Sequence, residues 1–294
     1  MKSKVWLITG SSRGLGRAFT EAVLAAGHQV VATARDPKQL SGLVQTHPAN
    51  LRAIALDVTD ASAAREAVRT AVAEFGRLDV VVNNAGYGNM AAVEDVSEED
   101  FRAQMETNFF GVVNVSRAAL PQLRSQRSGH IIQISSIGGR SSSPGLSAYQ
   151  SAKWAVGGFS EVLAKEVAPL GIRVTIVEPG GFRTDWAGSS MTIGPVREEY
   201  QPTVGRYAEF MRQHDGQQMG DPRKAARVLL QLVELEAPPL HLLLGSDAQY
   251  VAAASAANRA AEDARWKDLG ASTDFDDAPG IEALLSKLPA NSKA

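Results

Sequence analysis

Near its start the chain reads Val5-Trp6-Leu7-Ile8-Thr9-Gly10-Ser11-Ser12-Arg13-Gly14-Leu15-Gly16, which joins an apolar run to a glycine-rich turn. The apolar run predicts a buried strand, and Arg17–Ala26 has the composition of a helix that Gly27 can end. Glycines let the backbone turn tightly, and a helix N-terminus offers free N–H groups to a phosphate. This order predicts a dinucleotide-binding unit, although its spacing, Gly-x-x-x-Gly-x-Gly, is not the usual Gly-x-Gly-x-x-Gly. A tight loop without a ligand is the alternative.

A second informative pattern is the pair Tyr149 and Lys153, with Tyr149 thirteen residues after Ser136. Residues four apart lie on one face of a helix, so the phenol and the ammonium are expected to be neighbours. Because a cation favours the phenolate, Lys153 is expected to lower the pKa of Tyr149 from about 10 toward neutrality. A phenol with such a pKa is a workable general acid or base, and the Ser136 hydroxyl can hold a substrate oxygen beside it. Tyr-x-x-x-Lys alone also occurs by chance, and the glycine turn is what gives this pair weight.

Together the two motifs resemble those of the classical short-chain dehydrogenase/reductase family, and the resemblance extends from about Lys4 to Ser246. Other segments match at corresponding places, namely Asp57-Val58, Asn83-Asn84-Ala85-Gly86, Asn108, Pro179-Gly180 and Thr184. The resemblance implies a doubly wound parallel α/β sheet of the Rossmann type, with seven strands in the order 3-2-1-4-5-6-7 and the cofactor at their carboxyl edge. It also implies hydride transfer between a nicotinamide cofactor and a carbonyl or alcohol carbon.

The resemblance assigns catalytic roles to Asn108, Ser136, Tyr149 and Lys153. Tyr149 is expected to give its proton to the developing alkoxide, while Ser136 donates a hydrogen bond to the same oxygen. Lys153 is expected to hold the nicotinamide ribose as well. Asn108 is expected to anchor a water that relays protons, with purely local hydrogen bonding as the alternative. The family spacing to the tyrosine selects Ser136 over Ser135 as the catalytic serine.

The residues that the resemblance assigns to the cofactor lie mainly in turns that follow predicted strands. They are Gly10, Ser12, Arg13, Gly14, Leu15, Gly16, Arg35, Asp57, Val58, Asn84, Ala85, Gly86, Tyr149, Lys153, Pro179, Gly180 and Thr184. Plain structural roles stay open for Asp57, as a strand end, and for Asn84, as a turn former. The residues expected to line the substrate pocket are Tyr87, Gly138, Leu146 and Trp186.

The end of the second predicted strand bears on the choice of nicotinamide cofactor. Proteins of this fold that use NAD usually place an acidic residue there, whereas this chain has Ala34 followed by Arg35. A guanidinium can bind a 2′-phosphate bidentately, and Arg13 in the glycine turn supplies a second cation. The sequence therefore predicts NADP(H). The alternatives are that both arginines are solvated surface charges, or that Asp36 weakens their effect.

Composition is typical of an enzyme built on one α/β domain. The chain has 294 residues and a formal net charge of −2, which argues against nucleic acid as a partner. It has no cysteine, and its five histidines are scattered, so no metal site is expected. No apolar run approaches the ~20 residues that cross a bilayer, and no signal peptide is expected. We expect a cytoplasmic homodimer or homotetramer that acts on a small-molecule carbonyl or alcohol.

Apolar runs alternate with amphipathic stretches along the chain, which predicts seven strands and five helices. The predicted strands are 4–9, 29–34, 52–56, 80–83, 130–135, 173–178 and 240–244. The predicted helices are 14–26, 61–75, 98–125, 149–169 and 222–236. Ser97 and Asp100 form a capping box at the start of the third helix, and Pro121 is expected to kink or end it. Subunits are expected to pack through the helices that begin near Glu98 and Tyr149.

Two stretches stand outside this pattern. Residues 185–220 lack a clean period but carry aromatic and methionine side chains, so they are expected to cover the substrate, with an ordinary surface excursion as the alternative. Residues 247–294 extend beyond the catalytic domain 1–246, with a helix predicted over 247–267 and a mobile end after it. The chief rival function is a non-catalytic NADP(H)-binding regulatory or scaffold protein. Such a protein has no need for all four of the catalytic residues.

Overall fold

The central sheet contains seven parallel strands in the order β3-β2-β1-β4-β5-β6-β7, as the sequence predicts. The structure is a computed structural model that describes residues 3–184 and 191–287. Its strands are β1 (Val5–Ile8), β2 (Gln29–Ala34), β3 (Leu51–Ala55), β4 (Val80–Asn83), β5 (Gly129–Ile134), β6 (Ile172–Pro179) and β7 (His241–Leu244). The order reverses between β1 and β4, and a doubly wound sheet binds its ligand at such a point.

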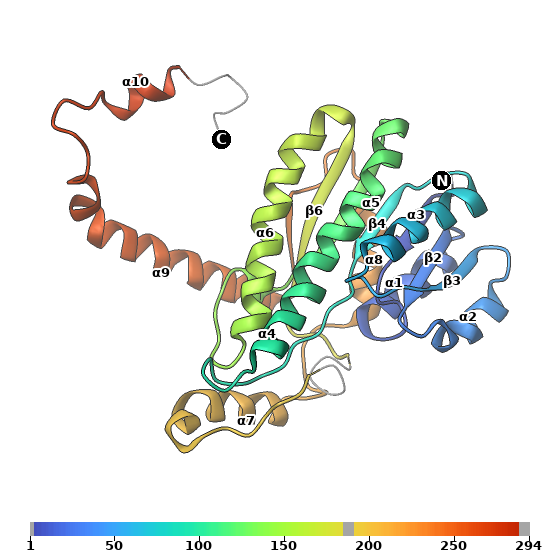
Figure 1. Cartoon of the computed structure of the whole chain (residues 1–294), viewed down its shortest axis with the longest axis horizontal. Helices are drawn as coiled ribbons and strands as arrows, with labels where there is room; N and C mark the ends of the chain where they lie inside the picture. The colour runs from blue at the N-terminus through green and yellow to red at the C-terminus, as the bar shows by residue number, and fades with distance from the viewer. Residues whose placement is uncertain (1–2, 185–190, 288–294) are drawn as a thin grey trace. The chain divides into compact units, whose positions relative to one another are not determined.

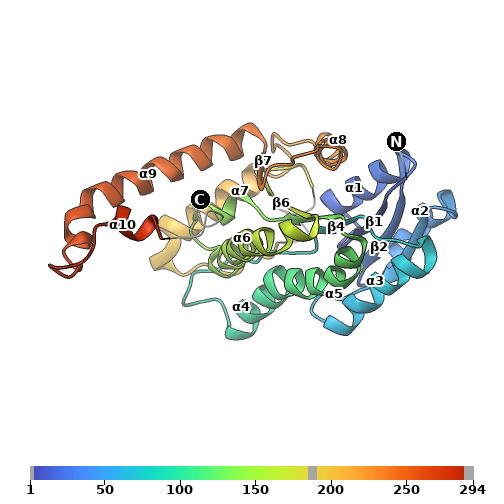
Figure 2. The same cartoon turned by 90° about the horizontal axis from the view of Figure 1, so that it is seen from above.

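Helices cover both faces of the sheet (Figures 1 and 2). On one face lie α1 (Gly14–Ala25) and α8 (Pro222–Leu232), and on the other lie α3 (Ala61–Phe75), α5 (Gly111–Gln126) and α6 (Ser147–Val167). The short helix α2 (Ser41–Thr46), which the sequence did not reveal, precedes β3. No helix among residues 3–184 and 191–287 is long and apolar enough to span a membrane.

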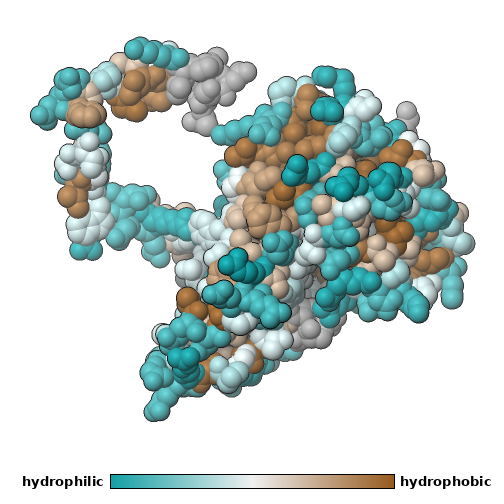
Figure 3. All heavy atoms as spheres, in the orientation of Figure 1, coloured by the Kyte–Doolittle hydropathy of each residue, from teal (hydrophilic) through white to brown (hydrophobic). Residues whose placement is uncertain are grey.

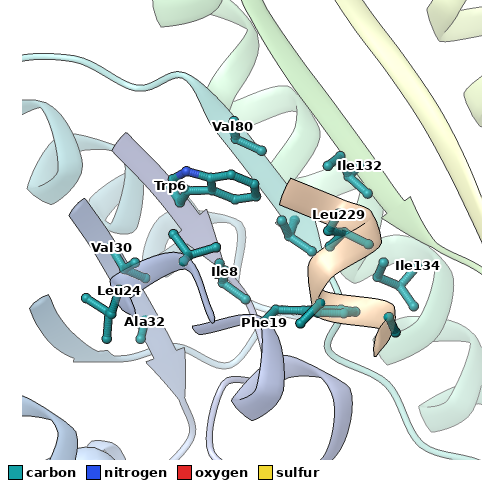
Figure 4. Close-up of a cluster of buried hydrophobic side chains, with 14 of the residues drawn as sticks. Trp6, Ile8, Phe19, Leu24, Val30, Ala32, Val80, Ile132, Ile134 and Leu229 are labelled. Carbon is teal, nitrogen blue, oxygen red and sulfur yellow. The ribbon is translucent and has the colours of Figure 1, made fainter. Parts of the chain in front are cut away.

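Alternation along β1 divides the core into two layers. Trp6 and Ile8 join the cluster beneath α1 and α8, whereas Val5 and Leu7 join the cluster beneath α3 and α5. Figure 4 shows Trp6 and Ile8 beside Leu229 of α8. Successive strand residues point to opposite faces, so a strand with apolar residues at every position is buried on both sides.

The long helix predicted over residues 98–125 is interrupted. It consists of α4 (Glu98–Met105), a π-helical turn (Glu106–Phe110) and α5, and Ser97 caps its start. Pro121 was expected to kink or end this helix, but α5 continues past it to Gln126. A proline removes one backbone hydrogen bond, and the buried face of α5 offsets that loss.

Residues 185–220 contain helical structure that the sequence did not predict. Within the described part, 191–220, a 3₁₀ turn (Glu198–Tyr200) and a π turn (Gln201–Gly205) lead into α7 (Arg206–Gln213). The segment passes through three types of helical turn, 3₁₀, π and α, so a single 3.6-residue period does not describe it. Its interior contacts come from a small apolar cluster described below.

The chain divides into two compact units, Met1–Ala252 and Ala253–Ala294. Helix α9 (Ser246–Ala271) begins in the first unit, where Ala248 and Ala252 are buried. The second unit holds the rest of α9 and α10 (Ile281–Leu285), and its described residues are exposed except Ser255, which is partly buried. The helix predicted over 247–267 is therefore present. The domain boundary at 246 stays a prediction, as does the mobile end, of which residues 288–294 lie outside the described residues.

Candidate active site

The glycine turn after β1 adopts the conformation that a phosphate loop requires. Gly10 and Gly14 have φ values of 66° and 56°, which favour glycine. A Cβ on Gly16 would overlap the carbonyl oxygen of Gly10, so the third glycine lets α1 approach the turn. The Arg13 side chain at the N-cap makes no capping hydrogen bond to α1. The N–H groups in the first turn of a helix can bind an anion, as the pyrophosphate site of this fold requires.

A second turn, at the end of β4, braces the glycine turn. The Asn84 side chain donates to the backbone oxygens of Thr9 (3.0 Å) and Gly10 (3.2 Å). In return, the backbone N–H groups of Asn84 and Ala85 donate to Thr9 Oγ1 at 2.9 and 3.0 Å. Asn84 thus has the structural role in a turn that the sequence left open. It also lies at the edge of the sheet where the resemblance implies contact with the cofactor.

The Tyr149 hydroxyl meets Ser136 at the carboxyl end of β5. The two hydroxyls are hydrogen-bonded to each other, and the Gly138 N–H donates to Ser136 Oγ at 3.0 Å. Ser135 faces the other way and donates to the backbone oxygen of Lys153 at 3.3 Å. Lys153 Nζ lies 5.6 Å from the centroid of the Tyr149 ring and donates to the backbone oxygen of Ile134 at 2.9 Å. Helix α6 therefore places the side chains of Tyr149 and Lys153 on one face, and Tyr149 meets Ser136 rather than Ser135.

Burial, and not the neighbouring ammonium, decides how Tyr149 ionises. Burial raises the pKa of Tyr149 to about 12, and the hydrogen bond with Ser136 opposes this rise. Burial also lowers the pKa of Lys153 from 10.5 to about 8. The expectation that Lys153 lowers the pKa of Tyr149 toward neutrality is wrong in this structure, because removal from water penalises the phenolate more than the nearby cation favours it. Tyr149 consequently holds its proton at neutral pH.

Asn108 lies at the centre of the π turn and is fully buried. Its carboxamide accepts from the Tyr87 N–H (3.1 Å) and donates to the backbone oxygens of Tyr87 and Gln104, both at 2.8 Å. These bonds reach the loop after β4, so they are not only local. A Cβ on Gly86 would lie 2.5 Å from Asn108 Oδ1 and 3.7 Å from Lys153 Nζ. The turn after β4, the π turn and α6 therefore converge at Lys153.

The loop after β6 reaches the glycine turn from the other side of the sheet edge. The Gly180 N–H donates to the backbone oxygen of Leu244 at 2.9 Å, which continues the pairing of β6 with β7. Thr184 packs against Gly14, because a Cβ on Gly14 would lie 3.6 Å from the Thr184 Cβ. The structure thus brings Pro179, Gly180 and Thr184 to the edge that carries the glycine turn.

Arg13 and Arg35 are both exposed, at the N-cap of α1 and just beyond the end of β2. Asp36 accepts a hydrogen bond from the Lys38 N–H at 3.0 Å and so caps the 3₁₀ turn Pro37–Leu40. The Asp36 carboxylate is therefore engaged in that turn. This limits how far it can weaken the attraction of Arg35 for a 2′-phosphate, which the sequence left open.

Asp57 and Val58 follow β3, and their side chains serve local structure. Asp57 Oδ1 accepts from the Thr59 N–H and hydroxyl at 3.0 and 2.8 Å. Val58 is buried against α5, where a Cβ on Gly111 would meet its side chain. Any cofactor contact at these two positions would come from the remaining carboxylate oxygen of Asp57 or from the backbone.

A small apolar cluster lies next to Tyr149 and joins residues 191–220 to the rest of the site. Its buried members are Met90, Ala92, Leu146, Met191, Val204 and Ala208. Tyr207 of α7 packs against the cluster and raises the pKa of Tyr149 electrostatically. Leu146 belongs to this cluster, and its role in lining the substrate pocket stays a prediction, whereas Trp186 lies outside the described residues. Met90 and Tyr207 were not predicted as pocket residues, because no motif or period marks them.

Comparison with known proteins identifies the family of this chain. The sequence profile described as short chain dehydrogenase matches residues 4–192. The chain belongs to the short-chain dehydrogenase family. The oxidoreductase BOA17 of Botryotinia fuckeliana is 54% identical over 268 residues, which cover 91% of this chain and 98% of that protein. This short-chain dehydrogenase is therefore an oxidoreductase.

Solved structures extend the likeness to the three-dimensional fold. A short-chain dehydrogenase from Streptomyces avermitilis has a TM-score of 0.87 and 40% identity, with 94% of this chain and 100% of that chain covered. A second one, from Burkholderia cenocepacia in complex with NADP, has a TM-score of 0.70 and 28% identity, with 90% and 97% covered. The roles of the individual site residues in the present short-chain dehydrogenase stay predictions.

Proposed function

We propose that this chain transfers a hydride between NADP(H) and a carbonyl or alcohol carbon, with Tyr149 as the general acid or base. The observation that carries this proposal is the hydrogen-bonded pair of hydroxyls, Ser136 and the buried Tyr149, with the Lys153 ammonium beside the ring. Two hydroxyls that meet at one point can both donate to a substrate oxygen. A protein that binds a nucleotide for regulation alone has no need for that arrangement.

The chain's own residues would handle the proton. NADPH supplies the hydride when bound. As negative charge develops on the substrate oxygen, Ser136 donates a hydrogen bond to it and Tyr149 transfers its phenolic proton. Lys153 then favours the tyrosinate electrostatically, and Asn108 holds the Tyr87 backbone close to that ammonium. The high pKa of Tyr149 suits the reductive direction, because the proton is present at neutral pH.

The glycine turn suits a dinucleotide pyrophosphate, since Gly10 and Gly14 have positive φ values and the Arg13 side chain makes no capping hydrogen bond to α1. Ala34 leaves the end of β2 without a carboxylate, and the exposed Arg35 and Arg13 can both reach solvent-facing phosphate. A guanidinium binds a 2′-phosphate through charge-assisted hydrogen bonds, which an unphosphorylated ribose cannot match. These features support NADP(H) over NAD(H), in line with the NADP complex of the Burkholderia cenocepacia relative.

The walls next to Tyr149 support an apolar substrate. Met90 and Leu146 belong to the apolar cluster against which Tyr207 packs, and Met side chains adapt to irregular apolar shapes. We therefore propose a ketone, an aldehyde or a secondary alcohol with a hydrophobic substituent as the substrate class.

We also propose that the chain forms a homodimer or homotetramer through α5 and α6. Apolar side chains gather over these two helices in Figure 3. Phe110, Trp154 and Val162 are 44%, 36% and 57% exposed, which leaves large apolar side chains in water unless a partner covers them.

The test is a panel of hydrophobic ketones, aldehydes and secondary alcohols, each assayed with NADPH and with NADH. We expect reduction of at least one apolar carbonyl, with the higher kcat/KM for NADPH. Binding of NADPH without turnover across the panel would favour the regulatory alternative. A higher kcat/KM with NADH would contradict the cofactor assignment but not the enzyme.

A further inference from the structure

Asp247 is an acidic residue that the proposed chemistry does not use, yet its side chain touches the cofactor edge of the sheet. It lies in the first turn of α9, at the start of the extension for which the sequence suggested no role. The helix begins immediately after β7 and Gly245, so its first turn lies beside the loop that follows β6.

The Asp247 carboxylate packs directly on two backbone segments. Its Oδ2 accepts from the Gly181 N–H at 2.7 Å. A Cβ on Gly180 would overlap both carboxylate oxygens, and a Cβ on Gly245 would overlap Oδ1. Glycine at 180 and 245 therefore makes the space that the carboxylate occupies. Oδ1 is buried and has no hydrogen-bond partner among the described residues, which is a costly arrangement for a carboxylate.

The same loop is held from the opposite side by the end of the substrate segment. The Gly220 N–H donates to the backbone oxygen of Gly181 at 2.9 Å, and the Arg183 N–H donates to the backbone oxygen of Gly220 at 3.0 Å. The Gly181 peptide thus accepts from Gly220 and donates to Asp247. The hydrogen bond with the Asp247 carboxylate is charge-assisted, and such bonds are stronger than hydrogen bonds between two neutral groups.

We propose that Asp247 is a positioning residue that fixes the Gly180-Gly181 backbone for the nicotinamide half of the cofactor. The inference rests on the proposed function and on the resemblance, which assigns Pro179 and Gly180 to the cofactor; we place that contact at its nicotinamide half. It gives the first turn of α9 a role in the active site. Without the carboxylate, the Gly181 N–H loses its partner, while the loop keeps the backbone bonds of Gly180 with Leu244 and of Gly181 with Gly220. The nicotinamide half then binds to a less firmly fixed backbone. The adenosine half binds at the glycine turn and Arg35 and does not depend on this loop.

The test compares two ligands by calorimetric titration of the full chain. NADPH occupies both halves of the site, whereas adenosine 2′,5′-bisphosphate occupies only the adenosine half. For Asp247→Ala we expect the Kd for NADPH to rise at least about tenfold, as for the loss of a hydrogen bond to a charged group, with the Kd for the bisphosphate unchanged. Asp247→Asn should restore most of the NADPH affinity, because an amide oxygen can still accept from Gly181. Asp263→Ala, at an exposed position further along α9, is the matched control.

The outcomes separate this inference from the proposed function. Wild-type protein that fails to bind NADPH would contradict both. If NADH proves the preferred cofactor, NADH replaces NADPH and adenosine 5′-monophosphate replaces the bisphosphate in the same comparison. Wild-type binding together with an unchanged Kd in Asp247→Ala would overturn the role of Asp247 alone. Equal weakening of both ligands would also overturn it, because general loss of structure affects both halves. If Asp247→Ala does not fold, Asp247→Glu gives the same comparison, since its carboxylate is one methylene too long for the space beside Gly180.

Discussion

Tyr149 ionises according to its burial, and this decides which direction of the reaction its proton favours. Only 7% of the Tyr149 surface is exposed, so the neutral phenol is the stable form and burial raises the pKa of Tyr149 to about 12. Lys153 experiences the same burial, and its pKa falls to about 8. Both shifts favour the uncharged species, as desolvation does for any buried acid or base.

The first prediction concerns the pH dependence of the two directions. Reduction needs the phenol, which persists at every pH below about 12, so kcat for reduction at saturating NADPH should stay flat from about pH 6 to 7 and fall above about pH 8, where Lys153 loses the charge that favours the tyrosinate. Oxidation needs the phenolate, whose fraction grows about tenfold for each unit of pH below that pKa. Its kcat should therefore still be rising at pH 10. A plateau in oxidation below pH 8 would show instead that the pKa is near neutral.

The second prediction concerns the cofactor. Ala34→Asp combined with Arg35→Leu introduces the carboxylate that NAD-users carry and removes a cation. Because each charge-assisted hydrogen bond contributes ~1.5–3 kcal/mol, the ratio of kcat/KM for NADPH to that for NADH should fall about 10- to 150-fold or more. Steady-state kinetics with both cofactors checks this, and Arg35→Leu alone separates the two effects. An unchanged ratio would mean that Arg35 is a solvated surface charge.

Several residue positions were predictable because their signals are local. The choice of Ser136 over Ser135 follows from family spacing and from the opposite directions of adjacent strand residues, and the structure places only Ser136 against Tyr149. The pKa of Tyr149 was not predictable in this way. It depends on the burial of Tyr149 and on the electrostatic effect of Tyr207, which is far away in the sequence, and a one-turn motif carries no information on either.

At the scale of elements, regular periods predicted well and irregular helices did not. The helix over 61–75 and the strands over 29–34 and 80–83 have the predicted bounds, because each is a single element with one period. The π turn at Glu106–Phe110 was missed, since its one extra residue shifts the apolar pattern at a single point, which the average over a helical window hides. That turn holds Asn108, so its irregularity occurs at a position with a proposed catalytic role.

The third prediction concerns the substrate segment 185–220, which we propose closes over the substrate and excludes water. Its described part presents exposed Arg206 and Arg212 to trypsin, beside the apolar contacts of α7. Cleavage there should be the fastest in the catalytic unit, and NADPH with a carbonyl substrate should slow it several-fold. Lys267, in the second unit, is the internal control and should be cut at the same rate throughout. Equal cleavage at Arg206 and Arg212 with and without ligands would argue against closure.

At the scale of the whole molecule, the exposed apolar side chains over α5 and α6 lead to the fourth prediction. Val162→Glu places a charge in the proposed subunit contact and should shift the wild-type dimer or tetramer toward monomer in sedimentation velocity runs. Leu235→Glu is the control, because Leu235 is 46% exposed just beyond α8, on the opposite face of the sheet. A monomeric wild type, or an oligomer that Val162→Glu leaves intact, would contradict the proposed contact.

The central claim is that Tyr149 supplies the proton, and Tyr149→Phe tests it most directly. This variant keeps the ring that packs beside Lys153 and removes only the hydroxyl that meets Ser136. With a carbonyl substrate and saturating NADPH, kcat should fall by at least ~10²-fold, while the Kd for NADPH stays near the wild-type value. Turnover close to that of the wild type, with the same carbonyl and the same cofactor, would contradict the assignment of Tyr149.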